Sequence, residues 1–168
     1  MDDDAMELLG RAVLIGAGAT VVMDLWAAVL KRAFGVARLD YRLLGRWIGH
    51  LPRGRLVHDN IARSEPVRGE LVIGWSAHYA IGITFAAVLL AVWGLEWARR
   101  PTVLPALIVG VGTVVAPFFI LQPCMGAGVA ASKTPAPNRA RLKSLVTHTV
   151  YGLGLYVSGL LWSLVRWG

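Results

Sequence analysis

An uncharged run of 25 residues, Leu71–Leu95, constrains the fold more than any other feature of the sequence. About 20 apolar residues are enough to cross the hydrocarbon core of a bilayer as a helix. Three other segments are long and apolar enough for the same structure, namely residues 11–30, 101–122 and 144–165. Together with a span at residues 71–94 within the uncharged run, they make four spans. The sequence therefore predicts an all-α fold, an integral membrane four-helix bundle that forms a single domain over residues 1–168.

Composition and charge agree with this class. Hydrophobic residues make up 56% of the chain and charged residues 16%, whereas a soluble domain has about 25% charged residues. The net charge of +7 would suggest nucleic acid in a soluble protein, but basic residues in a membrane protein mark its cytoplasmic loops. We therefore predict a lipid bilayer and no nucleic acid as the partner.

Two of the predicted helices carry a stripe of small residues that contains one ionisable group. The stripe in the span at 71–94 consists of Gly74, His78, Gly82 and Ala86. The stripe in the span at 11–30 consists of Ala12, Gly16, Thr20, Asp24 and Ala28. Four-residue spacing places each set on one helix face, where small residues let a neighbouring helix approach closely. A carboxylate in mid-membrane costs roughly 2.5–3.5 kcal/mol, so Asp24 should face protein or water.

The polar residues of the spans form a predicted intramembrane focus. At about 1.5 Å per helical residue, four of them lie within roughly 10 Å of one membrane boundary, namely Asp24, His78, Gln122 and His148. Three interpretations stay open. The group could form structural hydrogen bonds between helices, or a proton- or ion-linked site. It could also hold a metal or haem with His78 and His148 as ligands, although no cofactor is predicted from a motif.

The segment at residues 31–70 is polar and contains nine of the 17 Lys and Arg residues. Its apolar side chains follow a 3.6-residue period at Leu43, Leu44, Trp47, Ile48 and Leu51. This pattern predicts an amphipathic interfacial helix whose arginines contact anionic lipid headgroups. We expect His50 and His58 to be interfacial residues rather than metal ligands.

The third span contains Pro117, which predicts a kink with a freed carbonyl. The stretch after it, PCMGAGVAAS at residues 123–132, is either irregular backbone that lines a cavity or an ordinary loop. Lys133 and Asn138 follow as polar candidates in this loop. We expect Cys124 to be a plain small residue.

The basic residues also predict the orientation. Residues 31–70 and 123–143 together hold 13 of the 17 Lys and Arg residues and lie on one side of a four-span bundle. The positive-inside rule places them in the cytoplasm, with both chain ends outside.

Short fragments repeat in the two halves of the chain. TVV occurs at residues 20–22 and again at 113–115, and HYAIG at 78–82 matches HTVYG at 148–152. The order is the same in each half, which suggests two repeated helical hairpins, with a chance match in a Gly- and Val-rich chain as the alternative.

No catalytic motif is present, so catalytic residues are not assigned and an enzyme is the less favoured class. The leading interpretation is a small transporter- or channel-like protein, or an accessory membrane subunit, with a homo-oligomer or another membrane protein as a partner. The alternative is a bis-histidine haem or metal-binding membrane redox protein.

Four fragments resemble an uncharacterised family of small four-span bacterial inner-membrane proteins, a domain-of-unknown-function family. They are MDLW (23–26), LDYRLLGRWIGHLPRGR (39–55), HYAIG (78–82) and APFFILQPCMGAGVAASKTPAPN (116–138). The resemblance covers the chain from residue 10 to about residue 160. It implies four spans and a location in the bacterial inner membrane, and it implies no activity.

Overall fold

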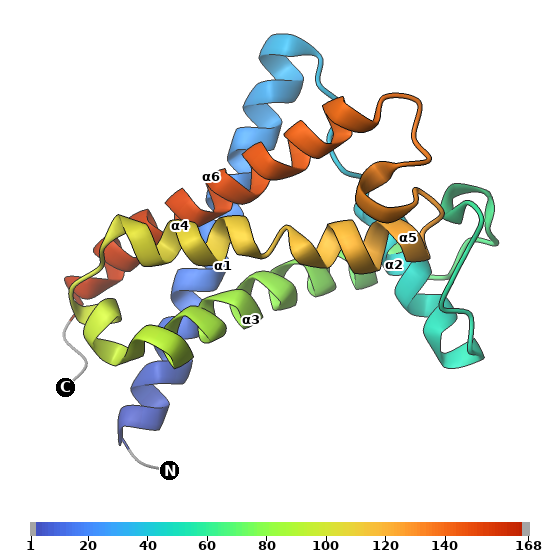
Figure 1. The fold of residues 1–168 in the computed structure, drawn as a ribbon. Helices are drawn as coiled ribbons and strands as arrows, with labels where there is room; N and C mark the ends of the chain where they lie inside the picture. Colours follow the sequence, from blue (N-terminus) through green and yellow to red (C-terminus); the bar gives the residue numbers. More distant parts are fainter. Residues whose placement is uncertain (1–2, 166–168) are drawn as a thin grey trace. The chain divides into compact units, whose positions relative to one another are not determined.

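The computed structural model describes residues 3–165, and all regular structure within them is helical (Figure 1). The α-helices are α1 Asp3–Phe34, α2 Tyr41–His50, α3 Glu70–Arg99, α4 Val103–Gly112, α5 Gln122–Cys124 and α6 Pro137–Ser163. Single turns lie between them: η1 Leu51–Arg53, η2 Ile61–Arg63, η3 Pro117–Leu121 and η4 Val129–Ala131. The predicted all-α class is confirmed.

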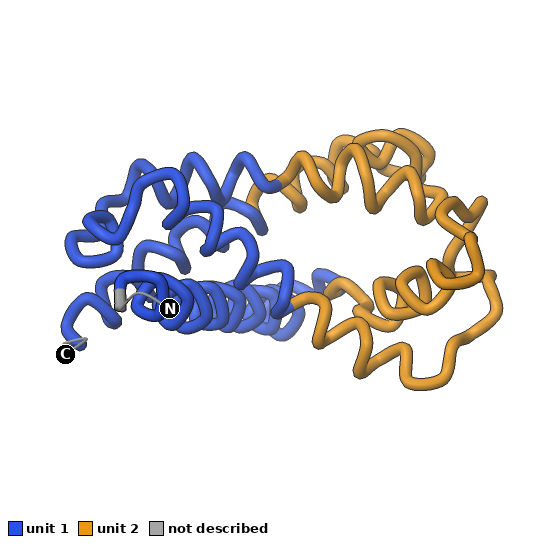
Figure 2. The backbone as a smooth tube through the Cα atoms, turned by 90° about the horizontal axis from the view of Figure 1, so that it is seen from below, with its two compact units in different colours: residues 1–37, 79–113, 147–168 blue, residues 38–78, 114–146 orange. Residues whose placement is uncertain are grey.

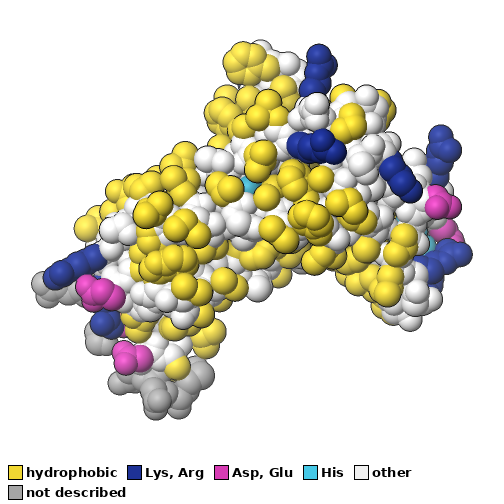
Figure 3. All heavy atoms as spheres, viewed as in Figure 1, with side chains coloured by type: hydrophobic (Ala, Val, Ile, Leu, Met, Phe, Trp, Pro, Cys, Tyr) yellow, Lys and Arg dark blue, Asp and Glu magenta, His cyan; other side chains and the backbone are white. Residues whose placement is uncertain are grey.

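Four helical stretches are long and apolar enough to cross a membrane. They are Asp4–Phe34, Glu70–Arg99, Val103–Cys124 and Pro137–Ser163. Large hydrophobic side chains stand exposed on them, among them Leu25, Val72, Phe119 and Leu161. Such side chains cover much of the face drawn in Figure 3. Exposed apolar surface of this extent on helices of this length fits contact with lipid, so the chain is a membrane protein with four membrane-spanning helices.

The third span is interrupted as the position of Pro117 predicts. Helix α4 ends at Gly112, and a π-helical turn begins at Pro117. A proline has no N–H to donate, and its ring clashes with the carbonyl four residues earlier, which here belongs to Thr113. The backbone therefore leaves the α-helical path between these two residues.

The chain divides into two compact units built from interleaved segments (Figure 2). The first unit comprises residues 1–37, 79–113 and 147–168, and the second comprises residues 38–78 and 114–146. Each unit has its own packing, and the two are described in turn.

Helices of the first unit cross at small residues. A Cβ atom on Gly16 of α1 would meet the backbone of Ile83 in α3, and one on Gly110 of α4 would clash with the backbone of Gly152 in α6. The surrounding core is apolar and consists of Ala12, Ile15, Ala19, Ala86, Leu89, Leu90, Trp97, Ala98, Ala106, Val109, Tyr151 and Leu155. Close backbone approach at glycine is a common way to join membrane helices.

The second unit is a folded loop packed on helix ends. Helix α2 lies against the start of α3, because a Cβ on Gly45 would clash with the Glu70 carbonyl. The Arg46 guanidinium binds both carboxylate oxygens of Glu70 at 2.8 and 2.9 Å. It also donates to the carbonyls of Ile61, Ala62 and Ser64. The hydrogen-bonded Glu70 carboxylate raises the pKa of Arg46, so this charge pair holds the loop to α3.

Candidate functional site

Both stripes of small residues face inward. Ala12, Gly16, Thr20, Gly74, His78, Gly82 and Ala86 are buried, and Asp24 and Ala28 are partly buried. The four-residue spacing therefore identified the packed face of α1 and of α3 correctly. The two ionisable groups on these faces are shielded: Asp24 is partly buried and His78 is buried. This agrees with the cost of placing a charge in lipid.

Asp24 of α1 is joined to α3 within the first unit. The Tyr79 hydroxyl donates a hydrogen bond to the Asp24 carboxylate at 3.4 Å. This distance is long for an O–H···O hydrogen bond. The pair therefore positions the carboxylate between two spans without a short, strong hydrogen bond to Tyr79.

His148 of α6 is joined to the end of α4, also within the first unit. The Thr113 hydroxyl donates to the Gly110 carbonyl at 2.6 Å and lies 2.8 Å from His148 Nδ1. We assign the hydroxyl hydrogen to the bond with Gly110, which makes Nδ1 the donor of the second bond. The neutral imidazole then keeps its lone pair on Nε2, which makes His148 able to accept a proton beside the interruption of the third span.

Helices α1 and α6 run antiparallel, which sets the depth of Asp24 relative to His148. Successive contacts along α1 reach successively earlier residues of α6: Arg11 with the Trp162 carbonyl, Gly18 with Ser158, and Ala19 with Gly154. From the last contact, Asp24 lies five residues further along α1 and His148 six residues back along α6. Both displacements point the same way, and they differ by about 1.5 Å at 1.5 Å per residue. Asp24 and His148 therefore lie at a similar level along the two helices.

His78 belongs to the second unit, where aromatic rings surround it. Its Nε2 atom lies 2.9 Å from the Tyr41 hydroxyl. The His78 ring stacks on Tyr41 with centroids 4.1 Å apart and meets the edge of Trp75 at 5.8 Å. This environment fixes the orientation of the imidazole near the start of α3.

Gln122 also lies in the second unit, in α5. Its side-chain oxygen is buried and has no hydrogen-bond partner in the described part of the chain. The predicted focus is thus divided: Asp24 and His148 share one unit, and His78 and Gln122 share the other. Convergence of all four stays a prediction, as does ligation of one haem by His78 and His148.

The two polar candidates of the loop are exposed. The Lys133 backbone donates to the Ala127 carbonyl at 2.9 Å, and the Asn138 side chain accepts from Arg141 at 3.1 Å. Ala130 and Ala131, which precede Lys133, have positive φ values of 47° and 60°. The stretch after α5 is therefore irregular backbone. The Lys133 bond stabilises this stretch, and the Asn138 bond stabilises the start of the following helix.

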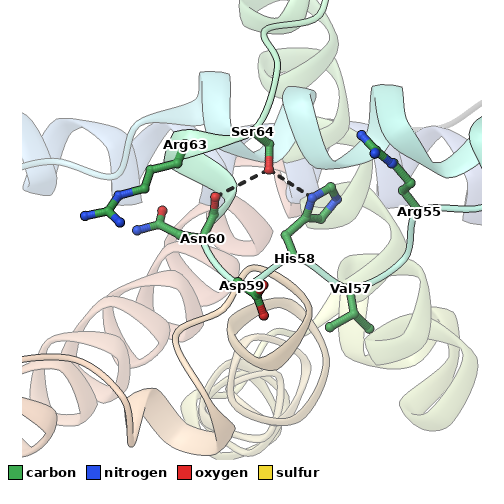
Figure 4. Close-up of a pocket in the computed structure, with 7 residues that line it drawn as sticks. All are labelled: Arg55, Val57, His58, Asp59, Asn60, Arg63 and Ser64. Carbon is green, nitrogen blue, oxygen red and sulfur yellow. Dashed lines mark hydrogen bonds between the residues drawn. The ribbon is translucent and has the colours of Figure 1, made fainter.

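The histidines of the polar loop differ from the sequence-based expectation. His50 is completely buried rather than interfacial, and its ring meets His58 edge-on with centroids 5.1 Å apart. His58 lines a cavity of about 550 Å³ together with Arg55, Val57, Asp59, Asn60, Arg63 and Ser64 (Figure 4). Within residues 3–165, no three His, Cys, Asp or Glu side chains are placed to hold a metal ion.

Three partner residues were missed by sequence reasoning. Tyr79 and Thr113 hold the intramembrane Asp24 and His148, and Glu70 holds Arg46. A signal existed for Thr113, which stands in the repeated TVV fragment. For Tyr79 and Glu70 the sequence offers no signal, because only the packing of distant segments makes them partners.

A comparison with protein families gives one match. Residues 13–162 match a family model described as a protein of unknown function (DUF2938). The match covers most of the chain and confirms the resemblance to a family without an assigned activity. Neither a curated protein nor a solved structure matches the chain.

Proposed function

The chain belongs to the DUF2938 family of proteins of unknown function, and we propose that it is a small transporter- or channel-like protein that moves protons, or an ion coupled to protons, across the bacterial inner membrane. One observation carries this proposal. Two ionisable side chains stand in apolar spans at a similar level along α1 and α6, and each is held by a hydroxyl group from another span: Asp24 by Tyr79, and His148 by Thr113. Ionisable residues in membrane spans are costly, and they often belong to proton relays.

The interruption of the third span supports the same function. The Thr113 hydroxyl binds His148 where α4 has just ended, and a π-helical turn follows at Pro117–Leu121. Non-helical backbone at membrane depth is tolerated where protein or water surrounds it, and transporters use such breaks to build ion sites. A proton-accepting imidazole at the break is the arrangement that a relay needs.

The basic loops support the proposed orientation. Arg53, Arg55, Arg63 and Arg68 are exposed on the segment between α2 and α3. We propose that this segment lies on the cytoplasmic side and contacts anionic lipid headgroups. A homo-oligomer or an accessory role beside another membrane protein remains compatible with the exposed apolar helix faces.

Proton flux into vesicles tests the proposal. Purified protein is reconstituted into liposomes that contain a pH-sensitive dye, and a pH gradient with a potassium-clamped membrane potential drives the flux. We expect faster acidification than in protein-free liposomes and loss of this difference in Asp24→Asn. The matched control is Thr84→Val, because Thr84 is an exposed hydroxyl on α3 that bonds only its own helix at the Ala80 carbonyl.

Two results would overturn the proposal. Flux through the native protein equal to that of empty liposomes would exclude a proton pathway under these conditions. Equal flux in the native protein and in Asp24→Asn would show that the Asp24 carboxylate has a structural role and does not carry protons. Co-purification with another membrane protein together with absent flux would favour the accessory role.

A further inference from the structure

A pair of histidines in the second unit has buried nitrogen atoms that the proposed proton pathway does not use. His50 is the last residue of α2 and is fully buried. Its Nε2 atom lies 3.0 Å from the Glu65 carbonyl oxygen, which can only accept a hydrogen bond. Nε2 therefore carries the proton of the neutral ring, and the lone pair lies on Nδ1. That Nδ1 atom is buried and has no hydrogen-bond partner in the described chain.

His58 has the opposite tautomer for a similar reason. Its Nδ1 atom lies 3.0 Å from the Ser64 hydroxyl oxygen, and Ser64 in turn donates to the Asn60 carbonyl at 3.3 Å (Figure 4). We assign the hydroxyl hydrogen to the bond with Asn60, which makes His58 Nδ1 the donor to Ser64. The His58 lone pair is then on Nε2, which is also buried and without a partner among residues 3–165.

Two buried lone pairs on neighbouring imidazoles need a donor or a metal. They cannot bind each other, since both are acceptors, and a buried acceptor without a partner is destabilising. We propose that His50 Nδ1 and His58 Nε2 bind a late first-row transition-metal ion. Metal-ligating histidines usually donate their other ring N–H to a carbonyl or a similar acceptor, and here the Glu65 carbonyl and the Ser64 hydroxyl fill that role.

The ring geometry fits two ligands of one ion. The centroids of His50 and His58 lie 5.1 Å apart, and the planes meet at 60°. Two imidazoles bound at the usual ~2.0–2.1 Å, with a tetrahedral angle at the metal, would have centroids about 5 Å apart. The observed centroid separation of 5.1 Å agrees with this value.

The rest of the coordination sphere would come from solvent. No third His, Cys, Asp or Glu side chain stands with this pair in the described residues, so the site would be open and exchangeable. His58 lines the cavity of about 550 Å³ and His50 does not, so an ion would reach the pair from the His58 side. Arg55 and Arg63 of the same cavity disfavour a cation but favour an anionic ligand beside it, and Asp59 offsets part of their charge.

The ligand type narrows the choice of metal. Neutral imidazole suits zinc, copper, iron and nickel, and divalent copper is bound most tightly of the first-row ions at a given nitrogen site. The ion expected to bind most strongly in a titration is therefore Cu²⁺, followed by Ni²⁺ or Zn²⁺. This site lies outside the membrane spans and does not depend on the proposed proton pathway.

Titration of the intact chain with copper tests the inference. The protein is purified without a polyhistidine tag and titrated with Cu²⁺ by calorimetry, and bound Cu²⁺ is examined by electron paramagnetic resonance. We expect one ion per chain with coupling to imidazole nitrogen. Ser64→Ala should weaken binding about 10–100-fold because it removes the hydrogen bond that orients His58. His58→Gln should weaken it further.

Controls and contrary results decide between a metal and a bridging water. Cys124→Ala should bind as the native protein does, since the proposal assigns no role to the thiol. If His50→Gln fails to fold, His58→Gln at the cavity wall still tests the site. Absent saturable binding, binding unchanged in His58→Gln, or loss in Cys124→Ala but not in His58→Gln would each overturn the proposal.

Discussion

Two helix pairs of the first unit, α1 with α3 and α4 with α6, are built alike. In each pair a glycine of one helix lies on the backbone of the other, at Gly16 with Ile83 and at Gly110 with Gly152. A threonine near each crossing bonds back to that glycine: Thr20 donates to the Gly16 carbonyl at 2.8 Å and Thr113 to the Gly110 carbonyl at 2.6 Å. The two threonines are those of the repeated TVV fragment. The spacing differs by one residue, four from Gly16 to Thr20 and three from Gly110 to Thr113, so the repeat of two helical hairpins stays a prediction.

The pairs differ four residues after each threonine. Asp24 stands there in α1, which continues unbroken to Phe34, whereas Pro117 stands there in the third span, where α4 has ended. The first pair thus carries a carboxylate on an intact helix. The second pair has a break, and the threonine beside it holds His148. One packing motif therefore lies beside two different polar groups, Asp24 on α1 and His148 on α6.

The glycine crossings should show the largest effects. Gly16→Leu and Gly110→Leu each place a side chain against backbone that cannot move aside, so each should cost more than the ~1–3 kcal/mol of ordinary overpacking. Gly112→Leu is the matched control, because nothing lies within 4 Å of a Cβ at Gly112. Size-exclusion chromatography in detergent checks the folded yield. Similar yields for Gly110→Leu and Gly112→Leu would refute the α4–α6 crossing.

Removal of the proline should make the two pairs more alike. Pro117→Ala restores an N–H that can bond the Thr113 carbonyl, and a proline in a helix interior costs about 3 kcal/mol relative to alanine. We expect a more stable protein with slower amide exchange at residues 117–121. Hydrogen-exchange mass spectrometry measures this. Unchanged exchange there would mean that contacts other than the proline impose the break.

The two threonines should differ in their contribution to the stability of the folded protein. Thr113→Val removes the bonds to the Gly110 carbonyl and to His148, so we expect a loss in the range of about 0.6–1.7 kcal/mol. Thr20→Val removes a bond within its own helix and should cost less. Thermal unfolding of both variants in one detergent gives the comparison. A larger loss of stability for Thr20→Val than for Thr113→Val would contradict the stronger role given to the Thr113 hydrogen bonds.

The smallest effect is expected at Tyr79. Its hydrogen bond to Asp24 is 3.4 Å long, so Tyr79→Phe should lower stability by no more than about 0.6 kcal/mol. The same unfolding assay applies. A loss as large as that of Thr113→Val would show that the Asp24–Tyr79 bond is stronger than its length indicates.

Local sequence pattern was sufficient to predict the spans and their inward faces. Apolar runs gave the four membrane helices, and four-residue spacing gave the buried faces that contain Asp24 and His78. Both signals depend only on hydrophobicity and helical periodicity, which are local properties. The position of Pro117 likewise predicted the interruption of the third span.

The partners of the polar groups could not be predicted in the same way. In the sequence, Arg46 is one of nine basic residues of a predicted interfacial segment. In the structure it forms an ion pair with Glu70, 24 residues later. His50 reads as a polar residue of a headgroup contact and is fully buried. In both cases the environment is created by segments that meet only after folding. Tyr79 and Asp24, 55 residues apart, illustrate the same limit inside the membrane.

Proton flux in a double variant tests most directly whether Asp24 and His148 serve one pathway. Asp24→Asn, His148→Gln and the double variant are reconstituted at equal amounts of folded protein, and their fluxes are compared with that of the native chain. We expect each single variant to lose about tenfold or more, and the double variant to be no slower than the single ones, because groups acting as a unit are not additive. Native flux in both single variants, or losses that multiply in the double variant, would contradict a shared pathway.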